Sequence, residues 1–92
     1  MYNLVRSLCY DCNMAVSLVE AFGQVLRTHR ERRGWSQMML ASEAGLHLNA
    51  VGNLERGKRG PTLQTLFLLC RALDVPVAHL VADIEKAKPA VK

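Results

Sequence analysis

Two asparagines stand four residues apart near the middle of the chain, Asn49 and Asn53, with Leu48 directly before the first. On a helix, residues four apart lie on the same face, so both side-chain amides would point the same way. An asparagine amide offers a donor and an acceptor side by side, which matches N6 and N7 of adenine in the major groove of DNA. The alternative for Asn53 is a solvent-facing side chain without a partner.

The segment that carries these residues predicts two short helices around a glycine turn. Ser36 can cap the first helix, and Gly45 ends it in a left-handed conformation that a side chain would penalise by about 1 kcal/mol. The second helix is expected from about His47 to Glu55, before a basic glycine loop. This organisation is typical of a helix-turn-helix, which lays its second helix in the DNA major groove.

The positive charge is concentrated in the same segment. The net charge is +4, and seven of the twelve basic residues but only three of the eight acidic ones lie between Arg27 and Arg59. Such an excess favours phosphate binding through counterion release, although a basic run alone is also typical of a solvated surface.

Further helices are predicted on both sides of this segment, and no strand is predicted. Ser17 with Glu20 forms a capping box before an apolar periodic stretch that ends near Gly34. Thr62 can cap a strongly apolar helix, and Pro76 suits the first turn of a last one. In the helix after Ser36, the residues expected to face inward are Met39, Leu40 and Glu43 or Ala44.

Three cysteines, Cys9, Cys12 and Cys70, do not form a disulfide framework in an intracellular setting. A zinc site with His79 or His29 and a thiol redox sensor are the two alternatives to ordinary packing thiols. We favour packing thiols, and we expect no metal and no cofactor.

In their order and spacing, these residues resemble the phage-repressor and Cro-like helix-turn-helix family, also called the Xre family. The landmarks lie between Phe22 and Asp83 and are Phe22-Gly23, Leu26, Arg30, Gly34-Trp35-Ser36-Gln37, Leu40-Ala41, Gly45, Val51, Leu54-Glu55-Arg56-Gly57-Lys58-Arg59, Pro61-Thr62, Leu66, Ala72-Leu73 and Val75. The resemblance implies an all-α, compact five-helix, lambda-repressor-like DNA-binding domain that binds double-stranded operator DNA as a homodimer.

The resemblance also implies roles for individual residues. Leu48, Asn49 and Asn53 match the positions that reach base edges. Arg30 and Glu55 match a structural ion pair between the first helix and the end of the recognition helix. The expected contacts to the DNA backbone are Ser36, Gln37, His47, Arg56, Lys58 and Arg59. Two residues depart from the family pattern: His47 replaces a capping serine or threonine, and Met39 replaces the glutamate of a capping box with Ser36.

The predicted domain organisation has three parts: an N-terminal extension at residues 1–16, the DNA-binding domain at residues 17–85 and a basic tail at residues 86–92. The extension continues an apolar helical stripe, which consists of Leu4, Leu8, Cys12, Ala15, Val19, Phe22 and Leu26. Three alternatives stay open for it: an additional dimer contact, a disordered segment, or a natural start of translation at Met14.

The last predicted helix carries Val77, Leu80, Val81 and Ile84 on one side, and we expect this face to form the homodimer interface. A transcriptional repressor or autoregulator is the function that these features favour. The alternative is an antitoxin-like module that uses the same fold to bind a toxin or another protein. No catalytic set is evident, so we do not expect an enzyme. The N-terminal residues lack a cleavage pattern and no apolar run is long enough to span a bilayer, so we expect a cytoplasmic protein without membrane contact.

Overall fold

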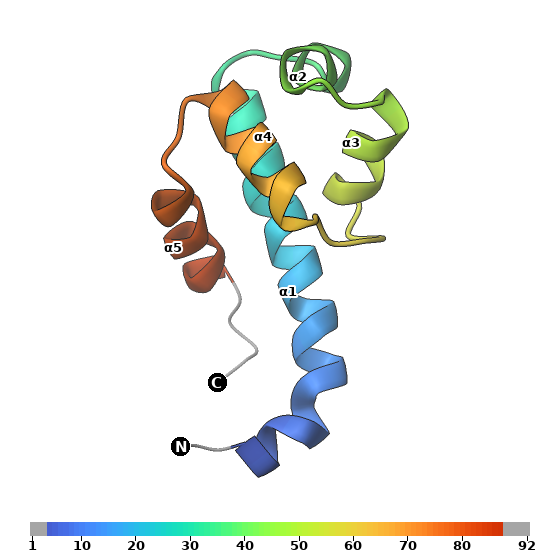
Figure 1. The fold of residues 1–92 in the computed structure, drawn as a ribbon, viewed down its shortest axis with the longest axis vertical. Coiled ribbons are helices and arrows are strands. Elements are labelled where there is room, and N and C mark those ends of the chain that lie inside the picture. Colours follow the sequence, from blue (N-terminus) through green and yellow to red (C-terminus); the bar gives the residue numbers. More distant parts are fainter. Residues whose placement is uncertain (1–3, 88–92) are drawn as a thin grey trace.

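The computed structural model describes the backbone of residues 4–87 and the side chains of residues 18–87. Over this range the chain forms five helices: α1 (Leu4–Arg32), α2 (Gln37–Ala44), α3 (Leu48–Glu55), α4 (Leu63–Leu73) and α5 (Val77–Ala87). Residues 4–87 contain no strand, so the predicted all-α class and the five helices are confirmed. Helices α3 and α5 both contact α1 and lie on opposite sides of it, while α4 contacts α2 and α5 (Figure 1).

Helix α1 is continuous over 29 residues and is longer than predicted. It runs through Ser17 without a break, so the prediction that Ser17 and Glu20 mark the start of a helix is wrong. The helix also crosses the predicted boundary between the extension and the domain, and its N-terminal end reaches beyond the other helices (Figure 1). The side chains of the apolar stripe from Leu4 to Ala15 lie outside the described residues.

The other helix ends follow local sequence signals. The Ser36 hydroxyl accepts a hydrogen bond from the Met39 N–H at 3.1 Å, and the Thr62 hydroxyl accepts one from the Thr65 N–H at 3.0 Å. Gly45 has φ 74°, as predicted for the turn after α2. Helix α4 ends at Asp74, a left-handed residue with φ 58°. Aspartate tolerates this region better than most side chains do, and the sequence analysis did not anticipate it.

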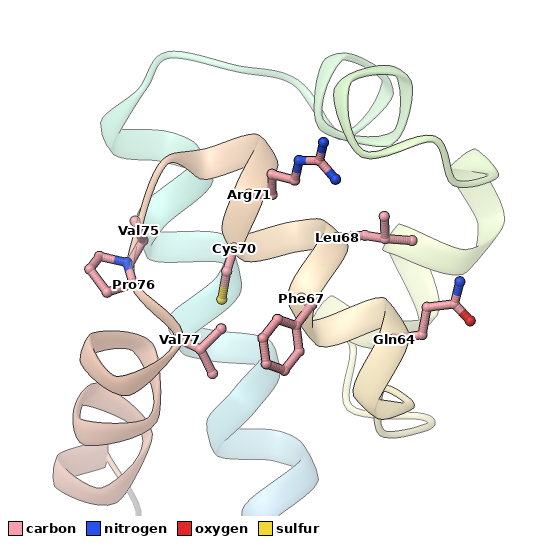
Figure 2. Close-up of a pocket in the computed structure, with 8 residues that line it drawn as sticks. All are labelled: Gln64, Phe67, Leu68, Cys70, Arg71, Val75, Pro76 and Val77. Atoms are coloured by element: carbon pink, nitrogen blue, oxygen red, sulfur yellow. The ribbon is translucent and has the colours of Figure 1, made fainter.

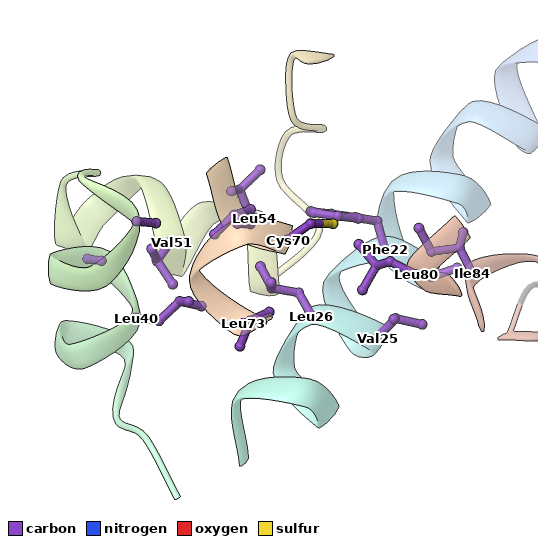
Figure 3. Packing of buried hydrophobic residues seen from close by; sticks show 14 residues of the cluster. Phe22, Val25, Leu26, Leu40, Val51, Leu54, Cys70, Leu73, Leu80 and Ile84 are labelled. Atoms are coloured by element: carbon purple, nitrogen blue, oxygen red, sulfur yellow. The ribbon is translucent and has the colours of Figure 1, made fainter. Parts of the chain in front are cut away.

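The hydrophobic core forms where the five helices meet. Its fully buried side chains come from every helix, and they are Leu26, Leu40, Val51, Leu69, Leu73 and Leu80. Phe22 and Val25 of α1 lie between this cluster and α5 (Figure 3). One core therefore holds both the helix-turn-helix pair and the C-terminal helices.

Two sequence predictions about exposed and buried faces are corrected by this core. Leu80 and Ile84 are buried within the chain itself, so they are not available as a dimer interface. Val81 remains exposed and Val77 is half-buried. Met39 was expected to face inward, but its side chain is exposed; only Leu40 and Ala44 of the predicted inward set are buried. Lys86 and Ala87, assigned to the tail, belong to α5.

A polar contact also holds α5 against α1. The buried His29 donates from Nε2 to Asp83 Oδ2 at 2.9 Å, and His79 Nε2 lies 3.7 Å from the same oxygen. The hydrogen bond from His29 is the main reason that the pKa of Asp83 lies below its usual value. The sequence pattern alone did not reveal this contact, because its partners are far apart in the chain.

Within the described part of the chain, no single helix has the length and apolar composition needed to cross a membrane. Helices α4 and α5 pass the same test only when they are taken as one segment, and the chain bends by 104° between them.

Gly23 allows α1 to approach the end of α3 at backbone contact. A Cβ atom at this position would lie 2.6 Å from the carbonyl oxygen of Leu54 and 2.7 Å from that of Glu55. Both atoms belong to the backbone and are part of a helix end, so they cannot move aside as a flexible side chain would. The position of α3 therefore depends on the absence of a side chain at Gly23.

We expect Gly23→Ala to destabilise the fold by about 1–3 kcal/mol, despite the better helix propensity of alanine, because the added methyl forces α1 and α3 apart. Urea unfolding measures the change. Gln24→Ala on the exposed face of the same helix is the control and should shift the midpoint little. Equal stability of the two variants would contradict the close approach.

Candidate nucleic-acid interface

Helices α2 and α3 form the corner that the sequence predicted. Directly after α2, the Leu46 N–H donates to the Ala41 carbonyl at 2.8 Å, which closes the turn at Gly45. Ala41 and Val51 are buried where the two helices face each other. The small side chain of Ala41 permits this close packing, so the orientation of α3 relative to α2 is fixed by the core.

Helix α3 has one face in the core and one face outside. Val51 and Leu54 are buried, whereas Leu48 and Asn49 are exposed. Asn53 is half-buried, and its Oδ1 accepts a hydrogen bond from Arg56 Nη2 at 2.8 Å. The three residues predicted to contact bases are therefore on the same short helix, but only Leu48 and Asn49 are well exposed.

A buried ion pair joins α1 to the end of α3. Arg30 donates from Nε to Glu55 Oε2 at 2.7 Å and from Nη2 to Glu55 Oε1 at 3.0 Å, while its Nη1 donates to the Trp35 carbonyl at 2.7 Å. The side chains are 11% and 3% exposed. The hydrogen bond to Glu55 is the main cause of a raised Arg30 pKa. The structure thus contains the ion pair that the family resemblance implied.

Gln37 has a role that the sequence analysis missed. It was assigned to the DNA backbone, but its Nε2 donates to Glu55 Oε1 at 3.0 Å. The Glu55 carboxylate therefore accepts hydrogen bonds from both α1 and α2 while it belongs to α3. No local pattern indicates this contact, because Gln37 and Glu55 are separated by 18 residues.

The basic residues divide into two groups. Arg27 pairs with Glu31, Arg30 with Glu55, and Arg33 donates to the Leu73 carbonyl at 2.8 Å. Arg33 also lies over the Trp35 ring at 4.6 Å. These arginines have partners within the chain, so fewer basic side chains are free to contact a ligand than the seven counted in the sequence.

The second group lies in the loop after α3. Arg56, Lys58 and Arg59 are exposed there, and the Lys58 N–H donates to the Asn53 carbonyl at 3.0 Å, which holds the loop against the helix. Ser36 and His47 are exposed at the starts of α2 and α3. His47 makes no side-chain cap, as its departure from the family pattern predicted.

The described side chains give no support for a metal site. Residues 18–87 contain no group of three or more histidine, cysteine, aspartate or glutamate side chains that could hold an ion. Cys70 is buried in the core, and its burial raises the pKa of the thiol. Cys9 and Cys12 lie outside the described side chains.

Comparison with known proteins identifies the domain. The sequence model of the helix-turn-helix family matches residues 26–80, which include α2, α3 and α4. The chain belongs to the helix-turn-helix family. This result confirms the resemblance found in the sequence.

Several relatives of this helix-turn-helix chain are named as regulators. The HTH-type transcriptional regulator SutR of Escherichia coli is 31% identical over 75 residues, which cover 82% of this chain and 42% of SutR. The control protein C.SmaI of Serratia marcescens is 35% identical over 66 residues, covering 72% of this chain and 79% of C.SmaI. The chain thus spans less than half the length of SutR.

Solved structures of similar proteins have the same fold. The restriction-modification controller protein C.AhdI from Aeromonas hydrophila matches with a TM-score of 0.66 and 40% identity, over 67% of this chain and 94% of C.AhdI. The clp gene regulator ClgR from C. glutamicum matches with a TM-score of 0.74 and 28% identity, over 82% and 96% of the two chains.

The buried position of Glu55 leads to a stability prediction. Glu55→Gln keeps the shape of the side chain but leaves the Arg30 charge buried without its partner, so we expect a loss of about 3–5 kcal/mol. The control is Glu31→Gln, which breaks the exposed pair with Arg27 and should cost at most about 1 kcal/mol. Urea unfolding of both variants separates the two cases. Similar losses would show that Glu55 is not the central contact.

Proposed function

We propose that this chain is a sequence-specific transcriptional regulator that binds double-stranded operator DNA through α3. The observation that carries the proposal is the division of α3 into two faces. Val51 and Leu54 anchor one face in the core, while Leu48 and Asn49 on the other face are exposed. A helix anchored in this way presents its polar side chains outward without losing its position.

The surroundings of α3 fit a duplex. The major groove is wide enough to admit one helix, and contacts to phosphates on either side fix its register. Lys58 and Arg59 follow the C-terminal end of α3, and Ser36 and His47 lie at the starts of α2 and α3. These residues supply the phosphate contacts in the proposed complex, while Asn49 and Leu48 contact base edges.

The names of the relatives support a regulator of transcription. C.AhdI is described as a restriction-modification controller, and RghR of Bacillus subtilis, 36% identical over 64 residues, as a transcriptional repressor. A small repressor or autoregulator is therefore the form of the proposal that we favour. The DNA upstream of its own gene is the first place to search for its operator.

Asn49 gives the direct test of base reading. A duplex enriched by the protein from a randomised pool serves as operator, and a scrambled duplex as reference. Asn49→Ala should weaken binding to the operator by about 1–3 kcal/mol and leave binding to the scrambled duplex unchanged. Lys58→Ala should weaken binding to both duplexes and reduce the slope of log affinity against log salt concentration by about one. Equal losses of Asn49→Ala on both duplexes would contradict base contact.

Gln24→Ala is the control for this experiment. Gln24 is an exposed polar residue of α1, outside the proposed DNA contacts, and its removal should leave binding to both duplexes unchanged. Wild-type protein that enriches no site and binds duplex DNA independently of salt would overturn the proposed function itself.

We also propose that the regulator is a homodimer that uses a groove between α4 and α5. The groove has a volume of about 430 Å³, and Phe67 and Val77 point toward each other across it (Figure 2). Phe67 is 53% exposed, which is unusual for so large an apolar side chain. Leu63 lies one turn before Phe67 on α4, and Val81 one turn after Val77 on α5.

This surface replaces the interface predicted from the sequence. Leu63, Phe67 and Val81 are the exposed apolar residues that flank the groove, whereas Leu80 and Ile84 are already buried within one chain. A second copy of the chain would cover the apolar stripe and bring two recognition helices to one palindromic site, with half-sites about 34 Å apart.

Phe67→Glu should therefore shift the protein from dimer to monomer, because a charge in the centre of the interface has no partner. Sedimentation at micromolar concentration measures the state. Met38→Glu is the control, since Met38 is also an exposed apolar residue but lies on α2. A wild-type protein that sediments as a monomer, or a Phe67→Glu variant that remains dimeric, contradicts this interface.

A further inference from the structure

Gly52 occupies an unexpected place in the middle of α3. Glycine inside a helix costs up to about 1 kcal/mol relative to alanine, and its φ is not in the left-handed region that would require it. Gly52 is nevertheless buried in the structure. A Cβ atom added here would lie 3.0 Å from Arg56 Nη1 and 3.6 Å from Arg56 Cζ and Nη2. The Arg56 guanidinium therefore lies over the bare backbone of Gly52.

The same guanidinium holds the side chain of Asn53. Arg56 Nη2 donates to Asn53 Oδ1 at 2.8 Å. One lone pair of the amide oxygen is occupied by a charged donor, and the amide plane is fixed so that Nδ2 points away from Arg56. Gly52, Asn53 and Arg56 thus form one unit. The absence of a side chain at Gly52 leaves room for the Arg56 guanidinium, and the guanidinium fixes the orientation of the Asn53 amide.

We propose that Gly52 and Arg56 are positioning residues for base recognition by Asn53, an inference that rests on the proposed DNA-binding function. Arg56 then acts on specificity rather than only on phosphate affinity. The hydrogen bond from Arg56 fixes the direction in which Asn53 Nδ2 and the second lone pair of Asn53 Oδ1 meet a base edge.

Charge-matched variants test the proposal. Each of the two variants, Arg56→Met and Arg59→Met, removes one positive charge. Both should therefore weaken binding to the scrambled duplex to a similar degree, and both should lower the slope of log affinity against log salt concentration by about one. Selection from a randomised duplex pool gives the base preference at each position. The position that loses its preference in Asn53→Ala is the position that Asn53 contacts. Arg56→Met should lower the preference there by roughly 5- to 150-fold, and Arg59→Met should leave it intact.

Gly52→Ala separates positioning from folding. The substitution improves helix propensity, so thermal stability should be retained or rise, while the added methyl displaces the guanidinium and lowers the preference at the same position. NMR relaxation of the Asn53 side-chain amide in the free protein gives a measurement without DNA. Its order should fall in Arg56→Met and not in Arg59→Met.

The outcomes that overturn the inference are distinct from failure of the proposed function. Equal base preferences in Arg56→Met and Arg59→Met, unchanged preference in Gly52→Ala, or unchanged Asn53 order in Arg56→Met would each refute it while DNA binding stands. A wild-type protein that enriches no duplex, with Asn53 ordered by Arg56 as described, would instead refute the proposed function.

Discussion

The ion pair between Arg30 and Glu55 determines how three helices meet. Glu55 is the last residue of α3, Arg30 lies near the end of α1, and Gln37 begins α2, so one carboxylate receives donors from both other helices. Removing two charges from water is costly, and such a pair contributes less to net stability than its short distances suggest. The ion pair mainly specifies how α3 packs, because a shift of α3 relative to α1 would leave a buried charge without a partner.

The hydrophobic core and the close approach at Gly23 act on the same helix from other sides. Val51 and Leu54 hold α3 through apolar contacts, which favour burial but do not specify direction. The backbone contact with Gly23 sets the distance to α1, and Glu55 sets the orientation. The exposed face of α3 is therefore defined by contacts on its buried side, which is the arrangement that a rigid recognition element needs.

The starts of α2 and α4 were predictable because they depend on neighbouring residues: Ser36 and Thr62 accept hydrogen bonds from backbone N–H groups three positions later. The prediction at Ser17 failed for a related reason, since a capping box competes with continuation of the helix and the local pattern does not show which one prevails. The prediction that Leu80 lies in a dimer interface failed because an apolar stripe on a helix indicates only that this face is buried. The stripe does not show whether it packs against the same chain or against a second copy.

The sequence of α3 has little tendency to form a helix by itself. It has eight residues, no side-chain cap at His47 and a glycine in its centre, and helices this short are marginal in water even with favourable sequences. The contacts of Val51, Leu54 and Glu55 therefore hold α3 in its helical conformation. Any change that weakens these contacts also makes the position of Asn49 less well defined. In the proposed DNA-binding mode, stability and recognition are coupled through this one short helix, and the residues that position α3 act on binding without touching the DNA.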